Sequence, residues 1–332
     1  MANILVTGGA GFIGSWLVDE LLKRGHDVTS VDDLSGGFMR NVSKGCRFVK
    51  MDIRDAKKVD RVVRGQDIIC HLAAYAAEGQ SVFSPIEIND INTTPMNNLL
   101  VSAVNHGVKK FVFTSSMAVY GNQQAPFSEE TLPLPEDPYG VGKLYCERML
   151  QIFSNVYEFD HVILRPHNVY GPRQNISDPY RNVLGIWINS IMRGKPPYIY
   201  GDGKQTRAFS YIGDMTAPLA NAVERDKANG EVINLGGHEP ISINDAYKML
   251  TKVAGSDAKP VYLEERPCEV KHAYCTIEKS EKLLGYKDNH TLRRGLGKMV
   301  KWAKEIGYQK PSYRIPLEIT KNAPVVWREK MI

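Results

Sequence analysis

The chain has 332 residues, of which 43% are hydrophobic and 24% are charged, and its formal net charge is +5. These values are ordinary for a globular protein, and the length suffices for one large α/β unit or two lobes, so a disordered or low-complexity chain is excluded. No apolar run approaches the ~20 residues of a membrane span, and no secretory signal precedes the first predicted strand. We therefore expect no membrane partner.

Cysteine usage and the distribution of charge narrow the setting further. The five cysteines, at positions 46, 70, 146, 268 and 275, include no Cys-x-x-Cys pair. This argues against a zinc site or a disulfide framework and predicts a reducing compartment, the cytoplasm. Residues 271–332 hold 14 Lys and Arg against 6 Asp and Glu, scattered among apolar residues on helical patterns. We interpret them as solvated helix surface and expect no nucleic-acid partner.

The first predicted elements indicate a dinucleotide site. Residues 4–6 are a short aliphatic run that suits a buried strand, Gly8, Gly11 and Gly14 follow it, and residues 15–22 have helical spacing. Glycines in such a turn let backbone N–H groups approach a pyrophosphate, which then lies on the helix N-terminus. The flanking strand and helix favour this interpretation over a plain tight turn.

A second strand is predicted over residues 27–31, and Asp32 stands at its end. An acidic residue at this distance from the glycine turn hydrogen-bonds an adenosine ribose and repels a 2′-phosphate. The sequence therefore predicts NAD, rather than NADP, as the cofactor.

Strands and helices continue to alternate through the first half of the chain. Further strands are predicted over residues 47–50, 67–72, 110–114 and 161–165, and helices over 57–64, 89–106 and 139–157. This alternation is typical of parallel βαβ units, so we expect a Rossmann-type, doubly wound parallel α/β sheet.

The alternation loosens after about residue 164. Helices are predicted over residues 182–193, 214–225, 242–253, 277–284 and 292–306, and short strands over 198–200, 208–211 and 232–234. We expect residues 1–166 to form an NAD-binding domain, and residues 167–332 to form mainly a smaller α/β substrate lobe interleaved with it. Doubly wound sheets bind ligands at the carboxyl ends of their strands, so this lobe is expected to pack there.

Hydroxyl side chains and a Tyr–Lys pair form the candidate catalytic group. Ser115 and Ser116 directly follow the predicted strand 110–114, at its carboxyl end. Tyr139 and Lys143 are four residues apart and share one face of a predicted helix. A phenol is a poor base at neutral pH, but a nearby ammonium and a cationic nicotinamide ring would lower its pKa and favour the phenolate.

An ordered set of motifs extends over roughly residues 4–306. The motifs are Thr7-Gly8-Gly9-Ala10-Gly11-Phe12-Ile13-Gly14, Asp52-Ile53-Arg54, His71-Leu72-Ala73-Ala74, Thr114-Ser115-Ser116, Tyr139-Gly140-Val141-Gly142-Lys143 and Arg165-Pro166-His167-Asn168-Val169-Tyr170-Gly171-Pro172-Arg173-Gln174. In them the chain resembles the extended short-chain dehydrogenase/reductases, and within these the NAD-dependent nucleotide-sugar epimerases and dehydratases, UDP-sugar 4-epimerases above all. Only the tail after Pro311 lacks a motif.

The resemblance implies a role for each motif. Ser116 would hydrogen-bond the sugar hydroxyl that is oxidised, Tyr139 would take its proton, and Lys143 would hold the nicotinamide ribose. Besides Tyr139 and Lys143, the implied NAD contacts are Gly8, Gly11, Phe12, Ile13, Gly14, Asp32, Asp52, Ile53, Ala73, Ala74, Tyr75 and Asn89. Besides Ser116, the implied contacts to a UDP-sugar substrate are Asn168, Asn182, Val183, Tyr200, Arg207, Arg266 and Glu269.

The two positions after the strand hydroxyls bear on the reaction. The resemblance implies an Asp-Glu pair there for 4,6-dehydratases and Ser-Glu for UDP-glucuronate decarboxylases, whereas this chain has Met117 and Ala118. Neither can move a proton, which favours 4-epimerisation through a transient 4-keto sugar with NAD retained. A UDP-glucuronate 4-epimerase and an oxidoreductase that exchanges NAD(H) remain open. So does an NAD-sensing module, although such a module would be expected to have lost Tyr139 or Lys143.

Ala273 is expected to set the width of the substrate. By the resemblance it lies against C2 of the sugar, where a small residue leaves room for an N-acetyl group. UDP-N-acetylglucosamine and UDP-N-acetylgalactosamine are then the expected substrates, with UDP-glucose and UDP-galactose as further ones. A register shift of one residue would put Tyr274 there instead.

The resemblance also implies a homodimer, held by a bundle of the helices predicted over residues 89–106 and 139–157. The apolar faces for it would come from Met96, Leu99, Leu100, Ala103, Leu144, Met149 and Phe153. Packing of these residues against the chain's own sheet is the alternative.

Overall fold

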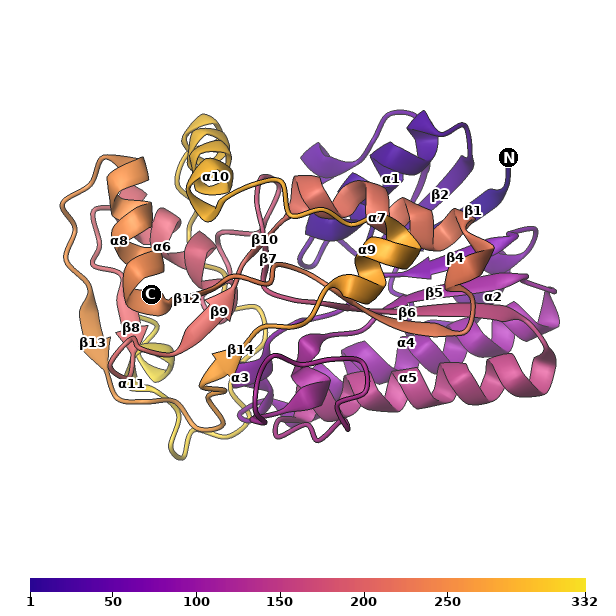
Figure 1. Cartoon of the computed structure of the whole chain (residues 1–332). Helices are drawn as coiled ribbons and strands as arrows, with labels where there is room; N and C mark the ends of the chain where they lie inside the picture. Colours follow the sequence, from indigo (N-terminus) through magenta and orange to yellow (C-terminus); the bar gives the residue numbers. More distant parts are fainter.

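A parallel sheet of seven strands forms the centre of the larger lobe in the computed structural model, which describes residues 1–332 (Figure 1). The strands are β1 (Asn3–Thr7), β2 (Asp27–Asp32), β3 (Arg47–Lys50), β4 (Ile68–His71), β5 (Lys110–Thr114), β6 (Asp160–Pro166) and β11 (Glu231–Leu235). Their order is β11-β6-β5-β4-β1-β2-β3. Because β2 and β4 lie on opposite sides of β1, the strand order reverses there, and a crevice for ligands opens at the carboxyl ends. The predicted Rossmann-type sheet is confirmed.

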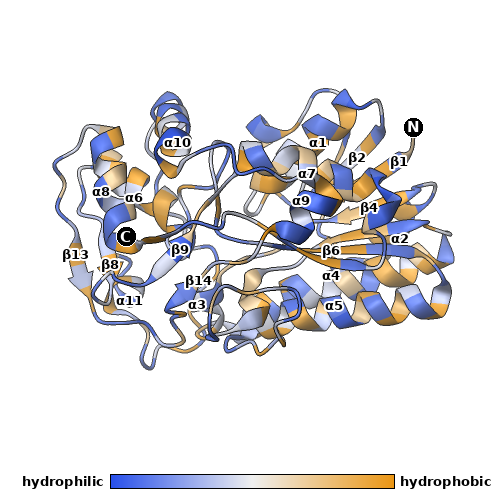
Figure 2. Cartoon of the chain, in the orientation of Figure 1, coloured by the Kyte–Doolittle hydropathy of each residue, from blue (hydrophilic) through white to orange (hydrophobic).

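Helices cover both faces of this sheet. The helices α1 (Phe12–Lys23), α7 (Ile212–Glu224) and α9 (Glu278–Leu284) share one apolar core with Ile4 and Val6 of β1. The helices α2 (Ala56–Val63), α4 (Pro85–Asn105) and α5 (Pro138–Tyr157) share another core with Leu5, on the opposite face. Figure 2 shows the strands of the sheet between two groups of helices, whose hydrophobic and hydrophilic residues alternate. Burial on both faces explains why the strands read as continuous apolar runs.

The chain returns to the larger lobe after residue 210. The strand predicted at 232–234 in the substrate lobe is β11, which pairs in parallel with β6 and completes the main sheet. The helices α7 and α9 also pack on this sheet. The predicted strand is therefore confirmed, and it lies in the larger lobe, since its apolar residues fit the open edge of β6.

The smaller lobe combines helices with short strands. Its helices are α6 (Val183–Met192), α8 (Ile243–Ala254) and α10 (Leu292–Ile306). Its strands are β7 (Val169–Tyr170), β8 (Tyr198–Tyr200), β9 (Thr206–Ala208), β10 (Ser210–Tyr211), β12 (Pro240–Ser242), β13 (Val261–Leu263) and β14 (His272–Ala273). The single strand predicted over 208–211 was wrong, because Ala208 pairs antiparallel with β12 and Ser210 pairs parallel with β7, in a different sheet.

Short helices complete the structure. They are α3 (Glu78–Ser81), α11 (Val325–Arg328) and the 3₁₀ helices η1 (Met39–Asn41), η2 (Met117–Tyr120) and η3 (Asp226–Ala228). None of the helices combines the length and hydrophobicity needed to cross a bilayer. After α10, the C-terminal segment, defined here as residues 310–332, runs back to the larger lobe, where the Glu318 backbone N–H donates to the Phe83 carbonyl at 2.8 Å.

Candidate active site

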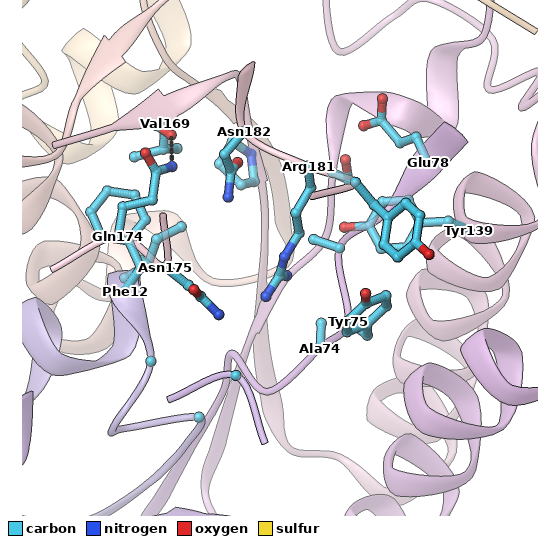
Figure 3. A pocket seen from close by; sticks show the side chains of 18 of the residues that line it. Phe12, Ala74, Tyr75, Glu78, Tyr139, Val169, Gln174, Asn175, Arg181 and Asn182 are labelled. Carbon is cyan, nitrogen blue, oxygen red and sulfur yellow. Dashed lines mark hydrogen bonds between the residues drawn. The ribbon is translucent and has the colours of Figure 1, made fainter. Parts of the chain in front are cut away.

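A cavity of about 450 Å³ lies at the carboxyl ends of the main sheet and is lined by residues of both lobes (Figure 3). This volume is within the range typical of small-molecule sites. The larger lobe contributes the glycine turn, the end of β2 and the residues after β4 and β5, and the smaller lobe contributes α6, β8 and β9. All predicted site residues except Asn89 and Ala273 line it.

The turn after β1 requires glycine at two positions. Gly8 has a φ of +73°, and a Cβ there would lie 2.8 Å from the Ala73 backbone. A Cβ on Gly14, in the first turn of α1, would collide with the Gly8 carbonyl oxygen. The turn is thus as tight as the backbone permits, and the free N–H groups at the start of α1 stand beside the cavity, as an NAD pyrophosphate requires.

Asp32 is held at the end of β2 by backbone donors. Its carboxylate accepts hydrogen bonds from the Ala10 N–H at 3.1 Å and the Leu34 N–H at 2.8 Å. Burial raises the pKa of Asp32, and these N–H groups oppose the shift. Asp32 lines the cavity beside the glycine turn, the place that suits an adenosine ribose. The residues present therefore fit NAD.

Asp52 and Ile53 line the same part of the cavity. The Arg54 guanidinium donates to Asp52 at 2.8 Å and lowers the pKa of its carboxyl. The Ala73–Tyr75 stretch after β4 lies opposite the glycine turn, since the Ala73 backbone contacts Gly8. The Tyr75 ring has the Arg181 guanidinium 5.0 Å from its centroid.

The catalytic candidates come from two neighbouring elements. Ser116 lies two residues after the end of β5 and is the N-cap of η2. Its hydroxyl accepts a hydrogen bond from the Ala118 N–H at 3.1 Å. Tyr139 and Lys143 lie one turn apart on α5, whose start is capped by Asp137. The Lys143 ammonium donates to the Thr114 carbonyl at 2.9 Å and lies 5.8 Å from the Tyr139 ring centroid. Ser116, Tyr139 and Lys143 all line the cavity.

Burial decides the ionisation of this group. It raises the pKa of Tyr139, the negative charge of Glu78 adds to the shift, and the Ser116 hydroxyl and Arg181 oppose it. Burial also lowers the pKa of Lys143 to about 8. The expected lowering of the Tyr139 pKa by Lys143 is therefore outweighed in this structure. A cationic nicotinamide ring would act in the opposite direction to burial.

A buried ion pair joins the elements that carry Ser116 and Tyr139. Glu147 of α5 accepts from Arg165 of β6 through both carboxylate oxygens, at 2.9 and 2.6 Å. The same carboxylate accepts from the Ser115 hydroxyl at 2.5 Å, and Arg165 also donates to the Tyr120 hydroxyl. These contacts join α5, β5 and β6, the elements that carry Tyr139 and Ser116.

Two arginines of the smaller lobe share one carboxylate. Glu269 accepts from Arg207 at 2.9 Å with one oxygen and from Arg266 at 2.5 Å with the other. Burial by itself would raise the pKa of Glu269, but the two positive charges hold it below its usual value. Glu269, expected to accept from a ribose, is thus engaged as the partner of both arginines. The two guanidinium groups and the Glu269 carboxylate together carry a charge of +1, which suits an anionic group such as a diphosphate.

The other predicted substrate contacts also reach the cavity. The Tyr200 ring lies 4.6 Å from the Arg266 guanidinium. The Asn168 amide donates to the Ala208 carbonyl at 3.2 Å, between the small sheets. Asn182 and Val183 stand at the start of α6, where Asn182 has a φ of +64°.

Two predicted site residues lie away from the cavity. Asn89 is on α4, and a Cβ on Gly142 of α5 would lie 3.1 Å from its side-chain oxygen, so it faces the packing of these helices. Ala273, on β14, is 0% exposed and belongs to the apolar core of the larger lobe. Tyr274 is not on the cavity wall either. The expectation that residue 273 touches the sugar is therefore not supported by the geometry, because pairing with β9 turns this segment into the core.

Several cavity residues were missed by sequence reasoning. Glu78 of α3, Arg181, Arg314 and Trp327 all line the cavity. Glu78 could have been suspected, because it is an isolated acidic residue in a run of small residues after a strand's carboxyl end. Glu78 is exposed, but the protein around it still desolvates its carboxylate, and this desolvation, together with the charge of Asp137, raises its pKa to about 7. Arg314 and Trp327 lie in a segment without a motif, so no sequence signal pointed to them.

Known proteins of similar sequence share this organisation. Residues 4–236 match the NAD dependent epimerase/dehydratase family. The chain is 35% identical over 305 residues to a putative UDP-glucose 4-epimerase of Methanocaldococcus jannaschii, a match that covers 91% of this chain and 98% of the relative.

Two solved structures of epimerases also match nearly the whole chain. A UDP-N-acetylglucosamine 4-epimerase of Methanobrevibacter ruminantium, in complex with UDP-N-acetylmuramic acid, is 35% identical with a TM-score of 0.85. A UDP-glucuronic acid 4-epimerase of Bacillus cereus, in complex with UDP-glucuronic acid and NAD, is 33% identical with a TM-score of 0.85. Each match covers 92% of this chain and 99% of the other. The chain therefore belongs to the NAD-dependent epimerase/dehydratase family and is an enzyme that uses NAD.

Proposed function

We propose that this enzyme is a UDP-sugar 4-epimerase that retains NAD through the reaction. Its proposed substrates are UDP-N-acetylglucosamine and UDP-N-acetylgalactosamine, with UDP-glucose and UDP-galactose as further ones. The observation that carries the proposal is the joint cavity, which brings Ser116, Tyr139 and Lys143 together with the two arginines on Glu269. The two residues after Ser116 are Met117, which lines the cavity, and Ala118, which does not. Neither side chain has a group that can give or take a proton, so neither provides an acid or a base for dehydration.

The chain's own residues would position the sugar and move one proton. NAD, when bound, supplies a reversible hydride acceptor. Tyr139 accepts the proton of the C4 hydroxyl during oxidation and returns it during reduction, while the Ser116 hydroxyl orients the same oxygen. Lys143 provides positive charge beside the phenol and is fixed by the Thr114 carbonyl at 2.9 Å. Arg207 and Arg266 retain the UDP group while the 4-keto sugar turns its other face.

The charge near Tyr139 favours an uncharged sugar over a uronate. Glu78 is near enough to Tyr139 to raise the pKa of the phenol. Each of the five arginines that line the cavity has a carboxylate partner. Arg181 pairs with Asp178, Arg207 and Arg266 pair with Glu269, Arg54 pairs with Asp52, and Arg314 pairs with Asp33. A sugar carboxylate would therefore meet the charge of Glu78 without an unpaired arginine, and like charges at close range are unfavourable.

Product analysis tests the reaction type. The purified protein, without added NAD, is incubated with UDP-N-acetylglucosamine, and products are identified by NMR. The galacto epimer is expected, together with NAD released on denaturation. A 4-keto-6-deoxy sugar, or net NADH production with added NAD, would contradict 4-epimerisation and support dehydration or oxidoreduction instead.

Substitution of Glu78 tests the substrate class. The wild type is expected to turn over UDP-N-acetylglucosamine with a kcat/KM about tenfold or more above that for UDP-glucuronate. Glu78→Gln should narrow this ratio, whereas the matched control Glu130→Gln, an exposed glutamate outside the cavity, should leave it unchanged. Equal kcat/KM for both substrates in the wild type would contradict the preference for uncharged sugars.

We also propose a homodimer in the cytoplasm. Of the residues expected at the dimer bundle, those of α4 are used inside the chain, because Met96, Leu99 and Leu100 are 0% exposed, whereas Leu144, Met149 and Phe153 of α5 are half-buried. The outer face of α4 and α5 instead exposes Val101, Val141, Tyr145, Ile152 and Val156, an apolar stripe that supports a helix-bundle contact. All five cysteines are free thiols, which suits a reducing compartment. A monomeric mass by light scattering at micromolar concentration would contradict the dimer.

A further inference from the structure

The C-terminal segment forms part of the wall of the active site. Three of its residues, Arg314, Trp327 and Ile332, line the cavity. The segment lies outside residues 4–236 and holds no recognisable motif. Its place at the cavity is therefore a property of this chain that the family match does not explain.

Backbone and side-chain hydrogen bonds fasten the segment to the larger lobe. Glu318 accepts from the Ile86 and Glu87 N–H groups, at 3.0 and 2.9 Å, and so caps the start of α4. The Ile315 carbonyl accepts from the Gln80 amide at 2.9 Å. Glu318 thus binds the segment to α4, and Ile315 binds it to α3, the helix that carries Glu78. These contacts fix the path of the segment past the cavity.

The end of the segment forms an aromatic corner at the substrate half of the cavity. Trp327 of α11 is 2% exposed and packs edge-on against Phe83, Tyr180 and Tyr200, with ring centroids 5.9, 5.2 and 6.1 Å away. Its indole N–H and the Tyr200 hydroxyl lie close together but have no hydrogen-bond partner of good geometry. The corner is therefore held by ring packing rather than by polar contacts.

Arg266 lies in this corner. Its guanidinium carbon is 4.6 Å from the Tyr200 ring centroid and 5.9 Å from the Trp327 ring centroid, whose planes differ by 67°. Glu269 fixes the polar edge of the same guanidinium at 2.5 and 2.9 Å. Gly79 of α3 leaves the remaining space, since a Cβ there would lie 3.3 Å from the indole and 3.4 Å from Arg266. The side chain is thus confined by two rings, a carboxylate and a backbone.

We infer that Trp327, supplied by the C-terminal segment, is a positioning residue that sets Arg266 for the diphosphate of the substrate. The inference rests on the proposed function, because it assigns Arg266 to a nucleoside-diphosphate group. A guanidinium held against aromatic faces keeps its planar donors aimed in one direction and loses little freedom when an anion binds. Removal of the indole frees Arg266 to rotate, and binding of the diphosphate must then order it again.

Substitution of Trp327 in the full chain tests the inference. Trp327→Ala is expected to raise the KM for the UDP-sugar, and the Kd for UDP by calorimetry, about tenfold. The kcat is expected to stay within about twofold, and the bound NAD content unchanged, because Tyr139 and Lys143 are not touched. Trp327→Phe, which keeps a ring face in the corner, should restore most of the affinity. Trp302→Ala, at a half-buried tryptophan of α10 outside the cavity, is the matched control for a general loss of packing.

The possible outcomes separate the inference from the function on which it rests. A selective rise of KM and Kd in Trp327→Ala, absent in Trp302→Ala and reversed in Trp327→Phe, supports it. Unchanged KM and Kd in an active Trp327→Ala protein overturn it, and so does a parallel fall of kcat and NAD content, which would indicate a merely structural role. If Trp327→Ala does not fold, Gly79→Ala, which crowds the same corner, replaces it: raised KM and Kd with kcat retained support the inference, and unchanged KM and Kd overturn it. Failure of the wild type to bind UDP would overturn the proposed function itself.

Discussion

The catalytic half of the active site is carried by adjoining elements of one sheet, whereas the substrate half is assembled from short strands and the end of the chain. Ser116 follows β5, and Tyr139 and Lys143 lie one turn apart on α5. The next turn of α5 carries Glu147, which forms a buried ion pair with Arg165. Each position is fixed by neighbours that are close in sequence or in the main sheet. Substitutions there should change the rate or the stability of the whole lobe.

The substrate half depends on side chains that hold one another. Arg207, Arg266 and Glu269 come from β9 and a loop, and Trp327 comes from α11. Only Arg207 lies on a strand, in a small three-stranded sheet, and each of these side chains is fixed by an ion pair or a ring contact. Substitutions there should change affinity and specificity more than rate. We therefore expect substitutions in the catalytic half to change kcat, and substitutions in the substrate half to change substrate affinity, independently of each other.

The largest effect is expected at the catalytic base. Tyr139→Phe should lower kcat by ~10²–10⁴-fold, because only the proton acceptor is removed. Bound NAD and the Kd for UDP should stay at their wild-type values, measured by absorbance after denaturation and by calorimetry. Activity within a factor of two of the wild type would contradict the role of Tyr139.

Loss of the buried carboxylate below the catalytic strand should destabilise the larger lobe. Glu147→Gln leaves the Arg165 charge, 4% exposed, without its ion-pair partner, and removal of one member of such a pair costs about 3–5 kcal/mol. The measurement is the free energy of unfolding in urea, with Glu130→Gln as the surface control. A difference below about 1 kcal/mol, as is usual for exposed ion pairs, would show that the network does not support the sheet.

Cofactor choice should respond to Asp32. Asp32→Ala removes the carboxylate proposed to face the 2′ position of the adenosine ribose, so the preference for NAD over NADP should narrow by about tenfold, or about 1.4 kcal/mol. Dissociation constants for NADH and NADPH by fluorescence measure it. Equal binding of both cofactors by the wild type would refute the assignment of this strand end.

The smallest effect is expected from pH, at the boundary between the two halves. The pKa of Glu78 is raised to about 7, so the carboxyl is largely neutral below that pH and charged above it. Discrimination against UDP-glucuronate should therefore increase from about pH 6 to about pH 8, and Glu78→Gln should abolish this dependence. Tyr139 and Asp137 of α5 and the arginines on Glu269 face the same carboxylate, so the ratio of two substrates, rather than one rate, is the proper readout.

The sequence by itself determined the elements of this protein and its chemistry. The predicted spans of β3, β5, β8 and α10 agree with the structure at both ends, because their apolar periodicity and bounding turns are local properties. The meeting of the glycine turn, Asp32, Ser116, Tyr139 and Lys143 at one cavity was also predictable. It depends on short-range spacing and on the shared carboxyl edge of a parallel sheet.

Only the tertiary structure decided which distant residues meet. The apolar run of β11 suits either lobe, and its pairing with β6 alone places it in the main sheet. Ala273 is small and follows a plausible substrate loop, yet pairing of β14 with β9 turns it into the core. Glu78 and Trp327 face the cavity because α3 follows β4 and because Glu318 fastens the chain end to α4. The hydrogen bond between Gln80 and Ile315 joins residues 235 positions apart, and no local pattern encodes such contacts.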